Sequence, residues 1–128
     1  MINGKIDAEI EKNREANVIF EFARLLHINK IRFTLEKAFK IINPWNNRAE
    51  KLKPDMVIYG EDGTILAAVE FKGYKSSIPT EIGRYRRWKK TRQGSRYRRE
   101  FSNAIYVCGP HTFQVAYRKI LALAGAKK

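Results

Sequence analysis

The chain has 128 residues, of which 44% are hydrophobic, so residues 1–128 are long enough to form a single domain around a buried core. Its 26 basic and 13 acidic residues give a formal net charge of +13, which exceeds what solubility requires and favours a polyanionic partner, nucleic acid ahead of an anionic membrane surface. No apolar run approaches the roughly 20 residues needed to span a bilayer, the start lacks the apolar segment of a secretory signal, and a single cysteine excludes an intramolecular disulfide, so we expect an intracellular protein.

The first predicted element is a helix over residues 7–27, because apolar residues recur there at helical spacing. That apolar stripe consists of Val18, Ile19, Phe22, Leu25 and Leu26. Glu15 lies at the N-terminal end of the stripe, and Glu11 lies one turn earlier on nearly the same line. An acid on a core-facing stripe suits a metal ion or a polar cleft, and it equally suits the point at which the stripe leaves the core. The sequence leaves both interpretations open and does not decide between Glu15 and Glu11.

Residues 30–42 begin with alternating apolar and polar side chains, which indicates a strand, whereas residues 36–40 equally suit a helix. We favour one strand running to the end of the range. A polar loop over residues 43–48 follows. Its Trp45 either contacts nucleic acid or covers the edge of the core, and we favour the second interpretation. Lys51 and Lys53 then lead into the next element, where loops beside a site often contact the substrate.

The centre of the chain predicts a tight β-hairpin. Two short apolar runs, residues 56–59 and 64–69, flank the dipeptide Asp62-Gly63, which suits a two-residue turn with positive φ at both positions. With that dipeptide as the loop, Glu61 pairs with Thr64, and the register of the whole hairpin can be counted outward from this pair.

That register places Asp55, which follows Pro54, directly opposite Glu70, with their Cβ atoms about 5 Å apart. Lys72 lies two residues beyond Glu70 and therefore projects from the same face of the sheet. Two carboxylates and one ammonium thus converge on one patch, which is the arrangement of a candidate catalytic site.

Two like charges beside apolar strands require neutralisation, and Lys72 supplies one positive charge. A hard divalent cation such as Mg²⁺ accepts carboxylate oxygens together with phosphate oxygens and water. The alternative is that Asp55 begins a strand at a solvated end while Glu70 and Lys72 form a surface ion pair. One cysteine and two separated histidines give little support for a zinc site.

A helix is predicted to start at Pro79-Thr80-Glu81 and to run to about Gln93. A basic stretch without any acid begins inside this helix and continues beyond it. It contains Arg84, Arg86, Arg87, Lys89, Lys90, Arg92, Arg96, Arg98 and Arg99. We expect these residues, with Lys51, Lys53 and Lys75, to neutralise phosphates of a nucleic acid.

Three aromatic residues, Tyr85, Trp88 and Tyr97, are interleaved with the basic stretch and are available either to pack the helix or to stack on bases. Gly94 and Ser95 suggest a flexible break inside it.

The last predicted elements are a strand over residues 104–108 and a helix over residues 112–124. We expect Cys108, at the end of the strand, to be a small apolar residue of the core. The helix is apolar on more than one side, which favours a second burial partner such as another subunit.

The order helix, strand, hairpin, helix, strand, with Pro54-Asp55 and Glu70-Phe71-Lys72 in the hairpin, resembles the PD-(D/E)XK, or restriction-endonuclease-like, nuclease superfamily. The resemblance covers nearly the whole chain and includes Glu15 on the first helix. It implies an α/β fold of αβββαβ order plus a C-terminal helix, in which a central four-stranded mixed sheet is flanked by helices. It also implies divalent-metal-dependent hydrolysis of phosphodiester bonds.

Position by position, the resemblance implies that Asp55 and Glu70 hold Mg²⁺, which Mn²⁺ can replace, together with the backbone carbonyl of Phe71. Lys72 would orient or activate the attacking water and stabilise charge on the phosphorane. Glu15 would be the helix-borne acid that reaches the metal directly or through water. No serine or cysteine nucleophile with a paired histidine is apparent, so a covalent intermediate is not expected.

Within the superfamily, the size and the basic composition most resemble the small Holliday-junction resolvases of archaea, their viruses and some bacteriophages. This narrower resemblance implies a homodimeric, Mg²⁺-dependent endonuclease that cleaves four-way DNA junctions or other branched duplexes. The alternatives are a repair, restriction or homing-type nuclease with another DNA preference and a non-catalytic basic DNA-binding module. Glu81 and Tyr85 have the spacing of the Gln-xxx-Tyr signature of exonuclease-like relatives, with Glu in place of Gln, and helix packing explains Tyr85 equally well.

Overall fold

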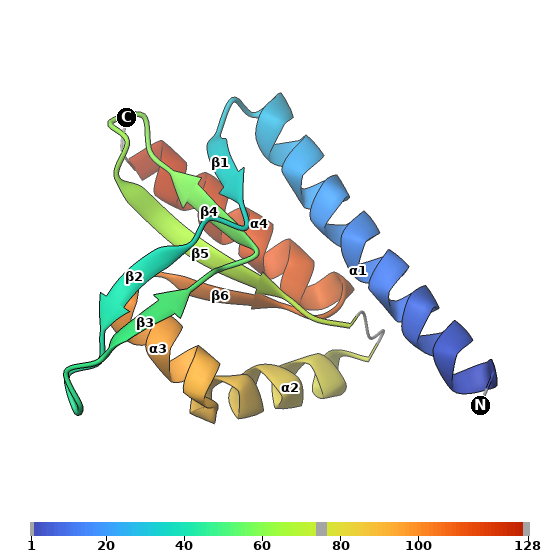
Figure 1. Ribbon diagram of the computed structural model, residues 1–128. Coiled ribbons are helices and arrows are strands. Elements are labelled where there is room, and N and C mark those ends of the chain that lie inside the picture. The colour runs from blue at the N-terminus through green and yellow to red at the C-terminus, as the bar shows by residue number, and fades with distance from the viewer. Residues whose placement is uncertain (1, 74–76, 127–128) are drawn as a thin grey trace.

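The computed structural model describes residues 2–73 and 77–126, with the side chains of residues 14–73 and 77–125 (Figure 1). The helices are α1 (Ile2–Ile28), α2 (Ile78–Lys90), α3 (Arg92–Glu100) and α4 (Pro110–Ala126). The strands are β1 (Arg32–Leu35), β2 (Phe39–Ile42), β3 (Ala49–Leu52), β4 (Met56–Tyr59), β5 (Ile65–Phe71) and β6 (Ala104–Val107). Within the described residues, no helix is long and apolar enough to cross a membrane.

Four strands form the central sheet in the order β1-β4-β5-β6. β4 pairs antiparallel with β1 and with β5, whereas β6 pairs parallel with β5, so the sheet is mixed. α1 and α4 cover one face, and α2 and α3 lie along the other (Figure 1). The expected α/β architecture, a four-stranded mixed sheet flanked by helices, is confirmed.

Two hydrophobic cores lie on the two faces of the sheet. The core under α1 and α4 contains Phe22, Met56, Val69 and Phe113, while Ala68 of β5 faces the core under α2 and α3. Because side chains alternate along a strand, residues of β5 that lie two positions apart share a face. This alternation determines which pair of helices covers each polar residue at the end of β5.

The strand expected over residues 30–42 is wrong, because it is broken into β1 and β2. Glu36 between them adopts φ of +54°, and its N–H donates to the Asp55 carbonyl at 3.1 Å. β2 then leaves the central sheet and pairs antiparallel with β3, which the sequence had predicted as part of a polar connection. We call β2, β3 and the connecting residues 43–48 the arm; it forms a separate two-stranded sheet (Figure 1).

The hairpin between β4 and β5 differs from the expected two-residue turn. The Gly60 N–H donates to the Thr64 carbonyl at 2.8 Å, and Gly63 lies at φ of +84°, so three residues form the loop. This longer loop shifts the register by one residue, and Tyr59 pairs with Ile65. The pairing then skips Leu66, which is therefore a β-bulge that restores the expected register.

The expected flexible break at Gly94 is also wrong. α2 ends at Lys90, and Thr91 caps α3 because its Oγ1 accepts from the Gly94 N–H at 3.1 Å. Gly94 is buried, and a Cβ at that position would lie 2.0 Å from the Trp88 carbonyl oxygen. Glycine is therefore required here for the close approach of α2 and α3.

The C-terminal part of the chain agrees with the predicted strand and helix. Cys108 is fully buried, as expected for a core residue, and the pKa of its thiol is raised by burial. α4 begins at Pro110, two residues before the predicted start, and Val115 on this helix remains 51% exposed.

Candidate functional site

Asp55, Glu70 and Lys72 lie at one end of the β4–β5 hairpin, on the face of the sheet that α2 and α3 cover. Met56 pairs with Val69, so the next position outward sets Asp55 opposite Glu70, as the sequence predicted. Glu70 shares its face with Ala68, two residues earlier, which packs in the core under α2 and α3.

Asp55 is half-buried and is held by the backbone of the opposite strand. Its Oδ2 accepts a hydrogen bond from the Phe71 N–H at 2.8 Å. Burial raises the pKa of the Asp55 carboxyl above its ordinary value, and this effect outweighs the hydrogen bond from Phe71 and the attraction of Lys72. The ionised form of Asp55 therefore lowers the stability of the folded protein.

Glu70 is buried, with 4% of its surface exposed, and both of its oxygens have partners. Oε2 accepts from the Tyr97 hydroxyl at 2.7 Å, and Oε1 lies 3.5 Å from both Gln93 Nε2 and Lys72 Nζ. Burial, followed by repulsion from Asp55, raises the pKa of Glu70 to about 7. The charge of Asp55 thus opposes the ionisation of Glu70, and the attraction of Lys72 does not compensate for it.

Lys72 completes the patch at its open side. The backbone N–H of Lys72 donates to the Val107 carbonyl at 2.9 Å, which extends the pairing of β5 with β6. The side chain is 44% exposed while its Nζ reaches Glu70. The ammonium is therefore accessible from solvent and anchored beside the carboxylate pair.

Gln93 and Tyr97 of α3 are functional candidates that the sequence reasoning missed. They lie four residues apart, hence on one face of the helix, and both contact Glu70. Gln93 Oε1 also accepts from the Trp88 indole N–H at 2.9 Å, which fixes the amide so that its NH₂ faces Glu70. Burial, followed by the nearby Glu70 charge, raises the pKa of Tyr97, so its hydroxyl remains a donor. The signal in the sequence was the Gln-xxx-Tyr spacing itself.

Glu81, the residue first matched to that signature, has a different role. It is completely buried, and its Oε1 accepts from the N–H of Thr112 at 2.8 Å and from the Thr112 hydroxyl at 2.9 Å. Its Oε2 accepts from the His111 N–H at 3.2 Å. Glu81 therefore caps the N-terminus of α4 and holds α2 against it. Tyr85 packs edge-on against Trp88 and Tyr106, as the packing interpretation expected.

Glu15 lies on α1, whose apolar residues pack on the opposite face of the sheet from α2 and α3. Burial raises the pKa of Tyr106, the β6 partner of Glu70, and the charge of Glu15 adds a smaller contribution to this rise. Among the described side chains, no three His, Cys, Asp or Glu residues gather as a metal-holding group, and the role of Glu15 stays a prediction. The side chain of Glu11 lies outside the described residues.

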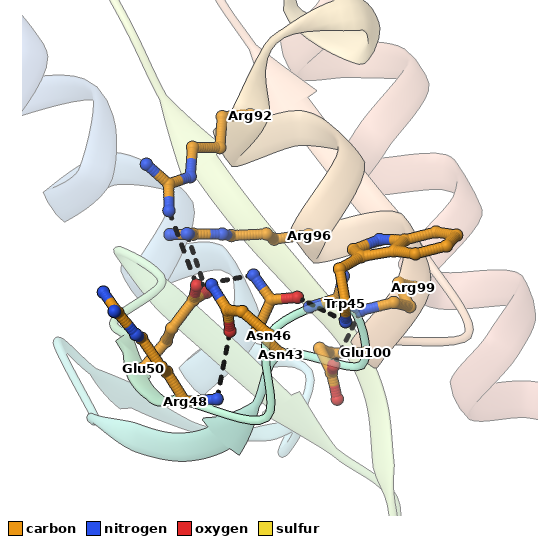
Figure 2. A network of polar contacts seen from close by, with 9 residues as sticks. All are labelled: Asn43, Trp45, Asn46, Arg48, Glu50, Arg92, Arg96, Arg99 and Glu100. Carbon is orange, nitrogen blue, oxygen red and sulfur yellow. Dashed lines mark hydrogen bonds and ion pairs between the residues drawn. The ribbon is translucent and has the colours of Figure 1, made fainter.

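The basic stretch divides into residues with internal partners and residues exposed to solvent. Arg84 donates to the Gly73 carbonyl at 2.9 Å, and Lys89 lies 4.9 Å from the centre of the Tyr85 ring. Arg92 and Arg96 pair with Glu50 of the arm at 3.4 and 2.7 Å (Figure 2). A compensating acid for the stretch therefore comes from β3, far away in the sequence.

The other members of the predicted DNA-binding set lie at the surface or outside the described residues. Lys75 lies outside the described residues. The exposed members are Lys51, Lys53, Arg86, Arg87, Lys90, Arg98 and Arg99. Of these, Arg99 pairs with Glu100 at 3.0 Å and Arg98 reaches the Lys89 carbonyl at 3.4 Å. Two of the interleaved aromatics, Trp88 and Tyr97, are buried in the core under α2 and α3, so they pack the fold.

The donor set fits a hard divalent cation. Asp55 and Glu70 offer carboxylate oxygens from opposite strands, and the pKa of each carboxyl is raised by burial. A cation between them would supply the positive charge that Lys72 alone does not. The Phe71 carbonyl, the third expected ligand, belongs to the residue between Glu70 and Lys72, and its role stays a prediction.

A scan of family models, a search of curated proteins and a search of solved structures each found no match to this chain.

Proposed function

We propose that this protein is a divalent-metal-dependent nuclease with a restriction-endonuclease-like core, which hydrolyses phosphodiester bonds in DNA and prefers four-way junctions. The observation that carries the proposal is the pair of opposed carboxylates, Asp55 and Glu70, with the Lys72 ammonium 3.5 Å from Glu70. Such a pair is costly to bury without a cation, so a purely structural role does not account for it.

Asp55 and Glu70 would hold Mg²⁺, or Mn²⁺ in its place. When bound, the metal polarises the scissile phosphate and lowers the pKa of a coordinated water. Within the chain, the Phe71 N–H orients Asp55, while Tyr97 and Gln93 orient Glu70. Fixed carboxylates lose little conformational freedom when a cation binds between them.

Lys72 would act on the water and the substrate. Its ammonium is a point charge on a flexible stem, and its partly exposed position permits contact with a phosphate oxygen. A contact that strengthens as negative charge develops on the phosphoryl oxygens stabilises the transition state more than the ground state. Two copies of the site, facing opposite strands of a junction in a homodimer, would cut it symmetrically.

The proposal is tested by incubating the wild-type protein with Mg²⁺ and four DNA substrates: a four-way junction, a flap, a linear duplex and a single strand. We expect Mg²⁺-dependent cleavage, fastest on the junction. Cleavage that survives chelation of all divalent cations would refute the metal-dependent mechanism. Faster cleavage of the linear duplex or the single strand would refute the junction preference and retain the nuclease.

A second candidate within the same superfamily is a nuclease of another DNA preference, including one that acts at DNA ends. The pair Gln93 and Tyr97 favours it, because their spacing matches the Gln-xxx-Tyr signature of exonuclease-like relatives and both reach Glu70. Adding a duplex with recessed ends to the substrate panel separates the two candidates. In both, Tyr97→Phe should weaken Mn²⁺ binding about 10- to 100-fold by calorimetry, as loss of a partner that orients a ligand does.

A non-catalytic DNA-binding module is the third candidate, favoured by the lack of a third clustered carboxylate in the described part of the chain. Calorimetric titration with Mn²⁺ separates it from both nucleases. Equal affinity of the wild type and of Asp55→Asn would favour the binding module, whereas a nuclease site predicts that the variant loses affinity.

A further inference from the structure

Trp45 is an exposed indole at the tip of the arm. Its side chain is 89% exposed, whereas Trp88, the other tryptophan of the chain, is 5% exposed. The expectation that Trp45 covers the edge of the core is therefore wrong. An indole left in water forfeits the burial energy that a large aromatic side chain normally contributes to stability, and its ring is available for contact with a partner.

The backbone that presents Trp45 is held by hydrogen bonds among residues 43–48, the tip of the arm (Figure 2). The Trp45 N–H donates to Asn43 Oδ1 at 2.9 Å, and the Asn43 N–H donates to the Arg48 carbonyl at 2.9 Å. The Arg48 N–H donates to Asn46 Oδ1 at 3.0 Å, and Asn47 occupies the left-handed region at φ of +56°, which asparagine tolerates. The tip is thus preorganised, so binding a partner does not require ordering the loop.

The tip is also fastened to α3. Asn43 Nδ2 donates to Glu50 Oε1 at 2.8 Å, and Glu50 in turn pairs with Arg92 and Arg96. Figure 2 shows the indole of Trp45 directed away from this carboxylate and its arginines. The hydrogen bond from Asn43 lowers the pKa of Glu50 most, and the charges of Arg96 and Arg92 lower it further. The pKa therefore lies below its ordinary value although burial raises it. Glu50, the only acid of the arm, is therefore neutralised by arginines of α3.

The outer face of the arm is basic. Lys40 pairs directly opposite Lys51 across the two strands, and both side chains are exposed. Like charges at such a position repel each other, and an anion between them removes the repulsion. Arg48 at the tip and Lys53 at the base are exposed as well. A rigid indole flanked by cations matches a nucleic-acid strand, whose bases stack on aromatic rings and whose phosphates carry the negative charge.

The arm leads directly into the candidate site. Asp55 follows Ala49, the first residue after the tip, by six positions, so at about 3.4 Å per residue the end of the tip lies within roughly 20 Å of the Asp55 backbone. A duplex strand advances about 3.4 Å per nucleotide, so one segment of about six nucleotides reaches both the tip and the site.

We propose that Trp45 stacks on an unpaired nucleobase, at a branch or in a single-stranded segment, while Lys40 and Lys51 contact the adjacent phosphates. The inference rests on the proposed function in taking DNA as the partner. It adds an element that selects where along DNA the site is placed.

The test uses the wild-type protein without divalent cations, so that DNA is bound and not cut. The ligands are a duplex with a single-stranded overhang and the same duplex with abasic residues in that overhang. We expect the solvent-exposed part of the tryptophan fluorescence, which comes from Trp45, to be quenched by the first DNA and not by the second. Trp88 serves as the buried internal reference.

Trp45→Ala should lower the affinity for the normal overhang about 5- to 100-fold, because stacking of one base has that weight, and should leave the affinity for the abasic overhang unchanged. The slope of log affinity against log salt should not change, since stacking releases no counterion. Lys51→Ala should instead reduce that slope by about one. Phe20→Ala removes another aromatic side chain, 73% exposed on α1, and is the matched control that should bind as the wild type does.

Equal quenching by both DNAs, or full affinity of Trp45→Ala for the normal overhang, would overturn the inference. Neither result bears on cleavage, which the Mg²⁺ assay measures separately. Quenching and affinity loss in a protein that never cleaves DNA would instead retain the stacking contact and refute the nuclease. Unchanged thermal unfolding of Trp45→Ala shows that the variant folds.

Discussion

Glu70 is the residue on which the electrostatics of the site converge. It is buried, it faces Asp55 across the hairpin, and its three partners, Tyr97, Gln93 and Lys72, do not offset the cost of its charge. Its pKa of about 7 measures that cost. The same carboxylate that weakens the folded protein at neutral pH is the group that a divalent cation would bind.

The sign of the resulting pH dependence follows from linkage. The pKa of Glu70 rises from 4.5 to about 7 on folding, so the folded state binds the proton more tightly than the unfolded state between these pH values. The stability contributed by this group is fully present below about pH 4.5 and is lost as the pH rises through about 7, a loss of about 3 kcal/mol.

We therefore expect Glu70→Gln to remove a destabilising dependence on pH. In the presence of a chelator, the free energy of unfolding of the wild type relative to Glu70→Gln should fall between pH 5 and pH 8. Denaturant melts at a series of pH values measure this difference. The contributions of the titratable groups that both proteins share cancel in it. A difference that stays constant over this range would show that Glu70 titrates normally.

At the scale of elements, the hairpin shows what the sequence predicts and what it does not. The facing of Asp55 and Glu70 was predictable from the apolar runs and the turn residues, although the turn itself has three residues in place of two. The bulge at Leu66 cancels that difference. A bulge carries no periodic signal, so the correct register depended on two local departures that compensate each other.

The arm was not predictable because its inward side chains are not all apolar. Glu50 of β3 faces α3, where Arg92 and Arg96 neutralise it, and these partners lie more than forty residues away. Local alternation therefore indicated a polar loop. The same dependence on distant partners concealed Gln93 and Tyr97, whose roles become visible once α3 lies over Glu70.

The junction of α2 and α3 makes a prediction about glycine. A Cβ at Gly94 would collide with the Trp88 carbonyl oxygen, whereas a Cβ at Gly83 would meet only the end of the Arg87 side chain at 3.6 Å. We expect Gly94→Ala to destabilise the protein by about 1–3 kcal/mol through forced separation of the helices. Gly83→Ala, inside α2, should stabilise it by about 0.5–1 kcal/mol through helix propensity.

Thermal or denaturant unfolding of both variants measures these effects. Equal stability of the two alanine variants would contradict the close approach of α3 to the end of α2. Because Gln93 lies beside Gly94, the first variant should also disturb the contacts of Glu70, which the second leaves in place.

At the scale of the whole molecule, some of the basic residues behind the net charge of +13 form internal ion pairs, and others are exposed to solvent. Arg92 and Arg96 hold the arm. Arg86 and Arg87 are exposed and form no hydrogen bond or ion pair within the described residues. Composition alone predicted a nucleic-acid partner without separating these roles. The separation required the position of Glu50, which the sequence does not indicate.

Salt titration of DNA binding tests this division. The double substitution Arg86→Ala with Arg87→Ala should reduce the slope of log affinity against log salt by about two, since each phosphate contact contributes about 0.9 to that slope. Arg96→Ala should change the slope less and should instead loosen the tip of the arm, which hydrogen exchange of residues 43–48 detects. A slope that is unchanged in the double variant would place the DNA on a different face.

We propose that Asp55 and Glu70 together support metal-dependent cleavage, and one gel assay tests this role most directly. A labelled four-way junction is incubated with the wild type, Asp55→Asn and Glu70→Gln in Mg²⁺, with binding of the same junction measured without divalent cations. We expect cleavage by the wild type, a loss of at least about a hundredfold in the rate for each variant, and junction binding by all three proteins. Cleavage by either variant at the wild-type rate would contradict a role for that carboxylate in the reaction.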